Sequence, residues 1–249
     1  MVCMVYQGSK NRIAKEIVPI IQKLINDNGI KYYYEPFVGG ANVIDKIVCE
    51  NKYGYDINDN LISLLKYIQS DTDISIAPED CPFEHYSDVR DCYNKKNDKY
   101  SKEYVSLVGY SASYGGRFFD GGYGRDRTGS RNIYKERVKV LKEQAPYLKD
   151  ITFDVLDYKD IDPKQYKDCL FYLDPPYKST KEYSKQSIDY NYFYDWCRQL
   201  AENNIVIISE YNMPDNFESV WEKPTKCYQK SNRTSADTRV EKLFVVRKD

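Results

Sequence analysis

The first 70 residues alternate between helical and strand-like patterns. Apolar side chains recur every three or four positions over residues 13–25, which predicts an amphipathic helix. Pro19 lies inside this stretch and is expected to kink or break the helix. Short runs over residues 31–36 and 53–57 are typical of strands. A second helical pattern begins at Asn58, a residue type that favours the N-cap position.

The last hundred residues return to this alternation. Apolar spacing around Phe193 and Leu200 predicts a helix between two strand-like runs. Alternating strands and helices imply an α/β fold with a doubly wound, mainly parallel sheet and helices on both faces. Such sheets bind ligands at the carboxyl ends of their strands. The strands expected in this part are residues 151–156, 169–173, 205–209 and 243–246, with a weaker candidate at 221–228.

Residues 71–149 differ from the two parts that flank them. The segment is rich in tyrosine and glycine, contains Pro78 and Pro82, and shows little apolar periodicity before Val138. We therefore expect one core built from residues 1–70 and 150–249, interrupted by an inserted module with mobile loops that is not part of the main sheet.

The composition narrows the classes of protein that the chain can belong to. Hydrophobic residues make up 41% and charged residues 30%, as is usual for a globular protein. No apolar run approaches the roughly 20 residues that cross a bilayer, and the N-terminus does not resemble a signal peptide. We expect a cytoplasmic protein with no membrane partner. The seven cysteines are scattered and His85 is the single histidine, which disfavours a metal site.

The formal net charge of -1 does not by itself indicate a nucleic-acid partner, but the charges are unevenly placed. Residues 117–149 hold nine Lys or Arg against four Asp or Glu, interleaved with aromatic residues. This mixture suits phosphates and bases. A solvated charged surface explains the same excess equally well.

The tetrapeptide Asp174-Pro175-Pro176-Tyr177 follows the apolar run 169–173 directly, so it is expected at the carboxyl end of a strand. An exocyclic base amine is a poor nucleophile because its lone pair is delocalised into the ring. Asp174 and the carbonyl of Pro175 can accept hydrogen bonds from such an amine and aim its lone pair at a methyl donor. Two prolines remove N–H donors, and Tyr177 offers a ring for an extruded base. The tetrapeptide predicts methylation of a base amine, although an ordinary turn can have the same four residues.

Residues 35–42, Glu-Pro-Phe-Val-Gly-Gly-Ala-Asn, also follow a predicted strand. The two glycines predict a tight turn that a ligand can approach, and Asn42 is expected to cap a helix through about Cys49. Asp56 ends the next strand about 20 residues later, where nucleoside-binding sheets place an acid on the ribose. A dinucleotide oxidoreductase would use the same features, but the tetrapeptide has no role there.

Together these motifs, with the glycine turn before the tetrapeptide, resemble the Dam-type family of DNA adenine methyltransferases. The resemblance implies a seven-stranded Rossmann-like methyltransferase sheet, with residues 71–149 as an inserted DNA target-recognition module. It implies S-adenosylmethionine as methyl donor, S-adenosylhomocysteine as product and no metal. The expected reaction is site-specific methylation of the 6-amino group of adenine in DNA, with the base flipped out of the duplex.

The resemblance also implies residue roles. Lys10 would meet the donor's carboxylate, Asp56 its ribose, and Asp157 with Tyr158 its adenine, although Asp157 is one of several acids in its stretch. Arginines are expected to bind DNA. The expected donor-binding residues are Tyr6, Gly8, Lys10, Glu35, Pro36, Phe37, Gly39, Asp56, Asp157, Tyr158 and Asp174. The expected catalytic residues are Asp174, Pro175, Pro176 and Tyr177. The expected DNA-binding residues are Arg117, Arg125, Arg127, Arg131 and Arg233.

Some expectations stay open. Ala41 stands where the family often has glycine, and alanine adopts a positive φ less cheaply. The alternative functions are methylation of cytosine in DNA or adenine in RNA, and a catalytically silent nucleic-acid-binding relative. A monomer is expected, with a dimer as the alternative. Restriction protection, regulation and phage DNA modification all fit the sequence.

Overall fold

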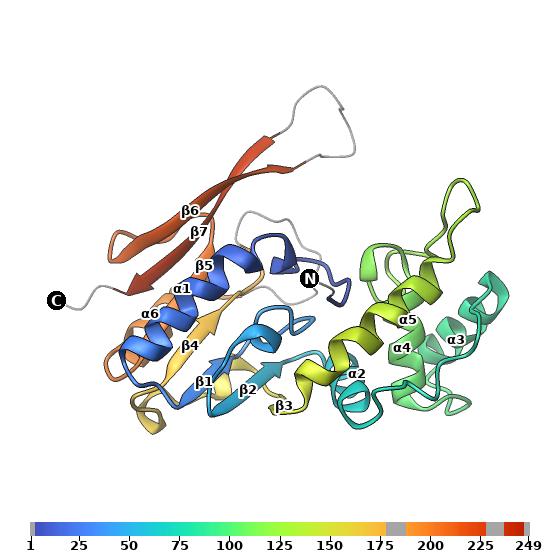
Figure 1. The fold of residues 1–249 in the computed structure, drawn as a ribbon, viewed down its shortest axis with the longest axis horizontal. Helices are drawn as coiled ribbons and strands as arrows, with labels where there is room; N and C mark the ends of the chain where they lie inside the picture. The colour runs from blue at the N-terminus through green and yellow to red at the C-terminus, as the bar shows by residue number, and fades with distance from the viewer. Residues whose placement is uncertain (1–2, 178–187, 228–236, 247–249) are drawn as a thin grey trace.

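The computed structural model describes residues 3–177, 188–227 and 237–246. Within these ranges a seven-stranded sheet has the order β3-β2-β1-β4-β5-β7-β6 (Figure 1). The first five strands of this order are parallel, whereas β7 runs antiparallel to both of its neighbours. The predicted mainly parallel, doubly wound sheet is therefore confirmed. The strands are β1 (Tyr32–Glu35), β2 (Asn51–Asp56), β3 (Ile151–Val155), β4 (Leu170–Leu173), β5 (Ile205–Glu210), β6 (Phe217–Cys227) and β7 (Asp237–Val246).

The chain reverses its direction of travel across the sheet beside β1. β1 pairs with β2 on one side and with β4 on the other, both in parallel. The crossovers that leave β1 and β4 therefore diverge, and open α/β sheets bind ligands at the carboxyl ends of the strands where this happens. The glycine turn follows β1 and the tetrapeptide follows β4, so both motifs meet at this position.

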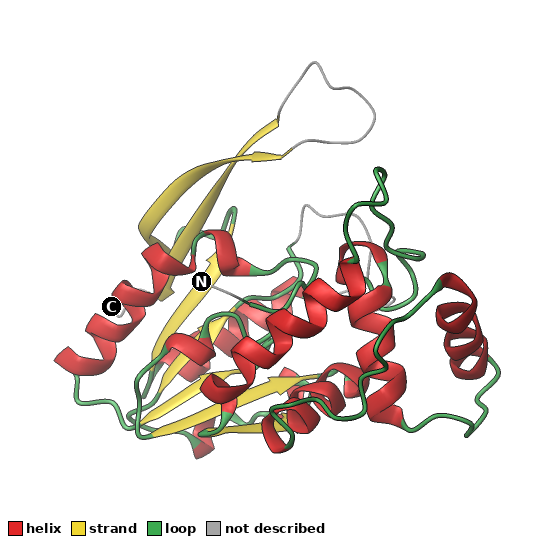
Figure 2. Ribbon diagram, turned by 45° about the vertical axis from the view of Figure 1, so that its right-hand side comes forward, coloured by secondary structure: helices red, strands yellow, loops and turns green. Residues whose placement is uncertain are grey.

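Helices pack against the sheet (Figure 2), and two clusters of buried side chains lie between the layers. Successive side chains of a strand point to opposite faces, so Tyr33 joins the cluster with α1 and α2, and Tyr34 joins the cluster with α6. The longer helices are α1 (Ala14–Asp27), α2 (Asp59–Ser70), α3 (Phe83–Asn94), α4 (Lys102–Ala112), α5 (Ile133–Gln144) and α6 (Tyr190–Ala201). The described 3-10 helices are η1 (Lys10–Arg12), η2 (Ile44–Lys46), η3 (Tyr114–Gly116), η4 (Ala145–Leu148), η5 (Tyr158–Asp160) and η6 (Pro163–Gln165).

Two expectations about the first helices were wrong. α1 continues through Pro19. The proline has no N–H to donate to the Lys15 carbonyl, but both residues are exposed, so water can reach that carbonyl. The helix expected after Asn42 is reduced to η2. The Asn42 side chain caps no helix and instead donates to the Met4 carbonyl at 3.0 Å and to Ser9 Oγ at 2.6 Å.

The insertion is built around helices. α3, α4 and α5 form most of it, and every residue of α4 from Val105 to Ala112 is buried. A helix buried on all sides has no polar face, which explains why no periodicity marked it in the sequence. Its apolar side chains, such as Leu107 and Tyr134, belong to the same buried cluster as α1 and α2.

The hairpin of β6 and β7 extends past the edge of the sheet. β5 pairs with β7 as far as Glu210 and Lys242, whereas β6 continues beside β7 to Cys227 and Asp237. The described part of this two-stranded ribbon projects from the body of the molecule (Figure 1). None of the helices in the described ranges combines the length and apolarity needed to cross a membrane.

Candidate active site

The N-terminal segment brings Lys10 to the tetrapeptide after β4. Ser9 caps η1 by accepting from the Asn11 N–H, and the next side chain is that of Lys10, which is buried. The Lys10 Nζ lies 2.9 Å from Asp174 Oδ1 and 4.3 Å from the centre of the Tyr177 ring. A cation is therefore held between the carboxylate and the aromatic face of the predicted catalytic motif.

Asp174 has an environment that works against its charge. Its side chain is 19% exposed. Burial raises the pKa of Asp174 to about 6, Lys10 opposes this shift, and the carboxylate of Glu241 adds to it. Asp174 can therefore change between acceptor and acid close to neutral pH.

Tyr177 is fixed by contacts at its hydroxyl and its ring. The hydroxyl donates to Glu241 Oε2 at 2.7 Å and lies 2.9 Å from Ser209 Oγ. The ring meets that of Tyr211 edge to face, with centroids 4.5 Å apart. Ser209 ends the strand-like run predicted beside the tetrapeptide, but neither Glu241 nor Tyr211 was singled out in the sequence, because each lies far from any motif.

The glycine turn after β1 is tied to Asp56 at the end of β2. Asp56 Oδ2 accepts the Gly39 N–H at 3.1 Å and its Oδ1 accepts the Asn58 N–H at 2.9 Å. Gly39 has φ of 50° and a Cβ there would lie 3.1 Å from the Tyr6 ring, so the turn requires glycine. Ala41 also adopts a left-handed φ of 56°. The departure from glycine noted in the sequence thus falls on a strained position.

Gln144, at the end of α5, joins the insertion to this turn. Its side chain is fully buried, and its Oε1 accepts the Met4 N–H at 2.9 Å. Its Nε2 lies 3.1 Å from both the Gly40 carbonyl and Asp45 Oδ2. Gln144 was not predicted as a site residue, since a lone glutamine on a helix carries no signal of its partners.

The pair Asp157 and Tyr158 lies just past β3. Asp157 caps η5 by accepting the Lys159 N–H, whereas Asp154 in the same acidic stretch pairs with Lys66 at 2.6 Å. The buried Tyr158 ring lies 5.3 Å from that of Phe37, which comes from the glycine segment. The segments after β1 and β3 therefore contribute neighbouring aromatic rings.

Glu35 is buried at the end of β1 beside Pro36, with an exposed fraction of 3%. Its carboxyl accepts from the Tyr33 hydroxyl at 2.6 Å. Burial raises the pKa of Glu35 well above its usual value, despite the Tyr33 hydrogen bond, so the neutral acid is favoured. Gly8 lies nearer the surface, where its carbonyl is 3.4 Å from Lys10 Nζ.

The described arginines predicted to bind DNA lie between η3 and the start of α5. Arg125 stacks on Phe83, with its guanidinium carbon 4.9 Å from the ring centre. Arg127 is exposed, and Arg131 forms a forked ion pair with Glu136. Arg117 is partly exposed and directly follows η3, and Arg233 lies outside the described residues.

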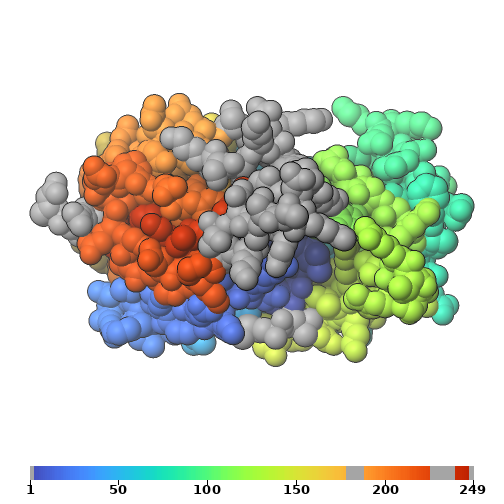
Figure 3. Space-filling view, turned by 90° about the horizontal axis from the view of Figure 1, so that it is seen from above, coloured from blue at the N-terminus to red at the C-terminus, as the bar shows by residue number. Residues whose placement is uncertain are grey.

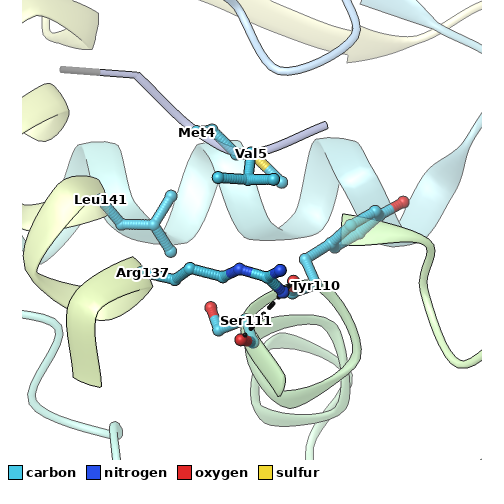
Figure 4. A pocket seen from close by; sticks show the side chains of 6 residues that line it. All are labelled: Met4, Val5, Tyr110, Ser111, Arg137 and Leu141. Atoms are coloured by element: carbon cyan, nitrogen blue, oxygen red, sulfur yellow. Dashed lines mark hydrogen bonds between the residues drawn. The ribbon is translucent and has the colours of Figure 1, made fainter. Parts of the chain in front are cut away.

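A small pocket lies where the N-terminal segment meets the insertion (Figure 4). The guanidinium of Arg137 extends into it and donates to the carbonyls of Tyr110, Ser111 and Ser113. Nearby, a Cβ on Gly116 would lie 2.1 Å from the Val5 carbonyl oxygen. The insertion therefore touches the backbone just before Tyr6. The pocket is lined by Met4, Val5, Tyr110, Ser111, Arg137 and Leu141.

The groups at this edge of the sheet fit S-adenosylmethionine. Asp56 uses one lone pair on each oxygen for backbone N–H groups and has further lone pairs that could accept from ribose hydroxyls. The rings of Phe37 and Tyr158 offer apolar surface for a purine, and Lys10 offers a cation for a carboxylate. Across the described residues, no three His, Cys, Asp or Glu side chains gather as a metal site.

Comparisons with known proteins agree with this chemistry. Residues 6–203 match the model of the D12 class N6 adenine-specific DNA methyltransferases. The chain is 28% identical to Type II methyltransferase M.MjaIII of Methanocaldococcus jannaschii, over 70% of this chain and 68% of that protein.

Two solved structures share only a distant likeness with the chain. A proposed RNA methyltransferase from Pyrococcus horikoshii has a TM-score of 0.44 and 9% identity, over 96% of this chain and 84% of the other. TrmN from Thermus thermophilus has a TM-score of 0.37 and 10% identity, over 96% and 52%. The family match covers most of the chain and confirms the methylation predicted from the tetrapeptide. The chain therefore belongs to the D12 class N6 adenine-specific DNA methyltransferase family, and it transfers a methyl group from S-adenosylmethionine to adenine in DNA.

Proposed function

We propose that the active site lies at the carboxyl ends of β1 and β4, with Asp174 and the Pro175 carbonyl accepting hydrogen bonds from the adenine amine. The observation that supports this most is the convergence of Lys10, Asp174 and Tyr177 next to a glycine turn held by Asp56. These groups come from separate segments that the fold joins at its switch point.

The donor supplies a methyl group already activated by its sulfonium charge. The protein's contribution is then to position the amine and to stabilise the positive charge that develops on it. Asp174 in its ionised form serves both needs. Tyr177 provides a ring for the flipped base, whose exposed amine Asp174 and Pro175 would hold. Asp56, Asp157, Tyr158 and Phe37 would hold the adenosine part of the donor, with Tyr6, Gly8, Glu35, Pro36 and Gly39 forming the rest of its pocket.

Lys10 would serve two partners in turn. Its ammonium group is paired with Asp174 in this structure, where the target amine would have to bind. The donor's carboxylate offers an alternative partner for the same cation. Release of Asp174 would then accompany the arrival of the donor, which is consistent with the predicted contact between Lys10 and the donor.

The insertion, residues 71–149, would recognise the target site. It carries the arginine-rich loop that precedes α5, and this loop rises on the same side of the molecule as the β6–β7 ribbon (Figures 1 and 2). Seen from above, the ribbon's strands and the insertion occupy opposite ends of this side (Figure 3). A duplex lying between them would bring an adenine to the carboxyl ends of β1 and β4. We further propose that the protein is a monomer that acts on DNA in the cytoplasm.

The decisive experiment follows methyl transfer from radiolabelled S-adenosylmethionine to unmethylated DNA, with nucleoside analysis of the product. We expect labelled 6-methyladenine, and we expect Asp174→Ala to abolish most turnover while keeping donor affinity by calorimetry. Label in cytosine or in RNA would contradict the substrate. Equal loss of turnover and donor affinity in Asp174→Ala would contradict the role given to Asp174.

A further inference from the structure

The C-terminal hairpin contributes a carboxylate to the catalytic motif. Glu241 lies in β7 next to Lys242, the last residue that pairs with β5, where the ribbon leaves the sheet. Its Oε2 accepts the Tyr177 hydroxyl at 2.7 Å. Because residues 6–203 carry the family match, this contact comes from a part of the chain outside the matched region.

The hydrogen-bond pattern around the Tyr177 hydroxyl follows from the chemistry of its neighbours. An ionised carboxylate can accept but not donate, so the single phenolic proton goes to Glu241 and Ser209 donates to the phenolic oxygen. Both hydrogen-bonding directions of the hydroxyl are then used. A hydrogen bond to a charged acceptor is shorter and stronger than a neutral one. The Tyr177 ring is held by its far end, while Lys10 lies over its face.

Glu241 has no competing use in the described part of the chain. The neighbouring Lys242 forms its ion pair with Glu222, at 3.7 Å, and none of the described lysines or arginines forms an ion pair with Glu241. The carboxylate therefore serves the Tyr177 hydroxyl rather than a salt bridge that stabilises the hairpin.

We propose that Glu241 is a positioning residue for methyl transfer, which holds the Tyr177 ring at the angle needed to stack on the target adenine. This proposal rests on the role of Tyr177 given above. The same carboxylate also faces the reaction centre, because its negative charge is one of the influences that raise the pKa of Asp174. The charged and titratable groups around Asp174 are Lys10, Glu241, Glu35, Tyr6, Tyr172 and Tyr177.

The test compares E241A and E241Q with the wild type, using a DNA duplex with one target site. We expect E241A to lower kcat/KM for DNA by roughly 10- to 100-fold, as befits a lost hydrogen bond to a charged group. E241Q keeps an acceptor and should recover most of this loss. Donor affinity by calorimetry should stay within about twofold in both variants, which also shows that they are folded. E222A is the matched control, because it removes an exposed carboxylate from the same hairpin.

A double-mutant cycle shows whether Glu241 acts through Tyr177. If it does, Y177F/E241A has nearly the kcat/KM of Y177F alone. The acidic limb of the pH profile should also move to lower pH in E241Q, because a charge that raises the pKa of Asp174 is gone. The proposal would be overturned if the losses in kcat/KM of Y177F and E241A multiply in the double variant, or if E241A has the wild-type rate. Failure of the wild type itself to methylate adenine would instead contradict the proposed active site.

Discussion

A single lysine sets the electrostatics of the proposed catalytic carboxylate. Asp174 is largely buried, and burial raises its pKa. Lys10 at 2.9 Å counteracts this shift, while the negative charge of Glu241 adds to it. Two residues from opposite ends of the chain therefore tune one acid in opposite directions.

The opposing influences on the pKa of Asp174 predict the direction in which the pH dependence of kcat/KM shifts when Lys10 is replaced. Protonation removes the acceptor that the adenine amine needs, so kcat/KM should fall with a slope of one below about pH 6. Lys10→Met removes the influence that lowers the pKa of Asp174. The acidic limb of the pH profile of this variant should therefore move to higher pH. Rates from pH 5 to 8 on one duplex test both. An acidic limb that stays in place in Lys10→Met would show that the ion pair is absent from the free enzyme.

The glycine turn shows how one element depends on another that is distant in sequence. Gly39 and Ala41 both have positive φ, a backbone conformation that alanine adopts at a cost. The turn persists because Gln144 of α5 binds the Gly40 carbonyl and the N-terminal segment together. The insertion thus contacts the proposed donor pocket, in addition to its proposed role in target recognition.

We expect Gln144→Leu to lower the free energy of unfolding by roughly 2–4 kcal/mol, because three buried polar groups lose a partner. Donor affinity should fall with it, since the turn is no longer held. Denaturant titration and calorimetry measure the two effects. Glu143→Leu, at the exposed neighbouring position, should change stability by no more than about 0.5 kcal/mol. Similar losses in the two variants would contradict the special place of Gln144.

At the scale of the whole molecule, charge placement matters more than the net charge of -1. The arginine-rich loop and the ribbon project on the same side (Figure 1). Arg125 is preorganised by its contact with Phe83, whereas Arg131 is already paired with Glu136. Arg125 and the exposed Arg127 are therefore the stronger candidates for phosphate contacts.

Reversing both charges, Arg125→Glu with Arg127→Glu, should weaken DNA binding. It should also reduce the slope of log K against log salt concentration by the equivalent of about one to two phosphate contacts. Fluorescence anisotropy across a salt series measures this slope. The matched control is Lys31→Glu with Lys149→Glu, which reverses two exposed charges just before β1 and β3, at the amino edge of the sheet. Equal slopes in both double variants would place the DNA path elsewhere.

Much of the fold was predictable because local patterns decide it. Each strand of the sheet overlaps a segment that was expected to be a strand, and Asn58 caps α2 as its residue type favours. The helix expected after Asn42 failed because that side chain binds the N-terminal segment instead. α4 was missed because burial on all sides removes periodicity. In both cases a tertiary contact replaced the local rule.

The sequence by itself determined the chemistry of this protein, because Asp174 to Tyr177, the glycine turn and Asp56 are short motifs whose residue types and order carry the information. The tertiary structure decided which distant side chains serve them. Lys10, Gln144 and Glu241 reach the site from the N-terminal segment, the insertion and the C-terminal hairpin. Their hydrogen bonds and ion pairs depend on distances of about 3 Å that arise only when the sheet, the insertion and the hairpin are packed together.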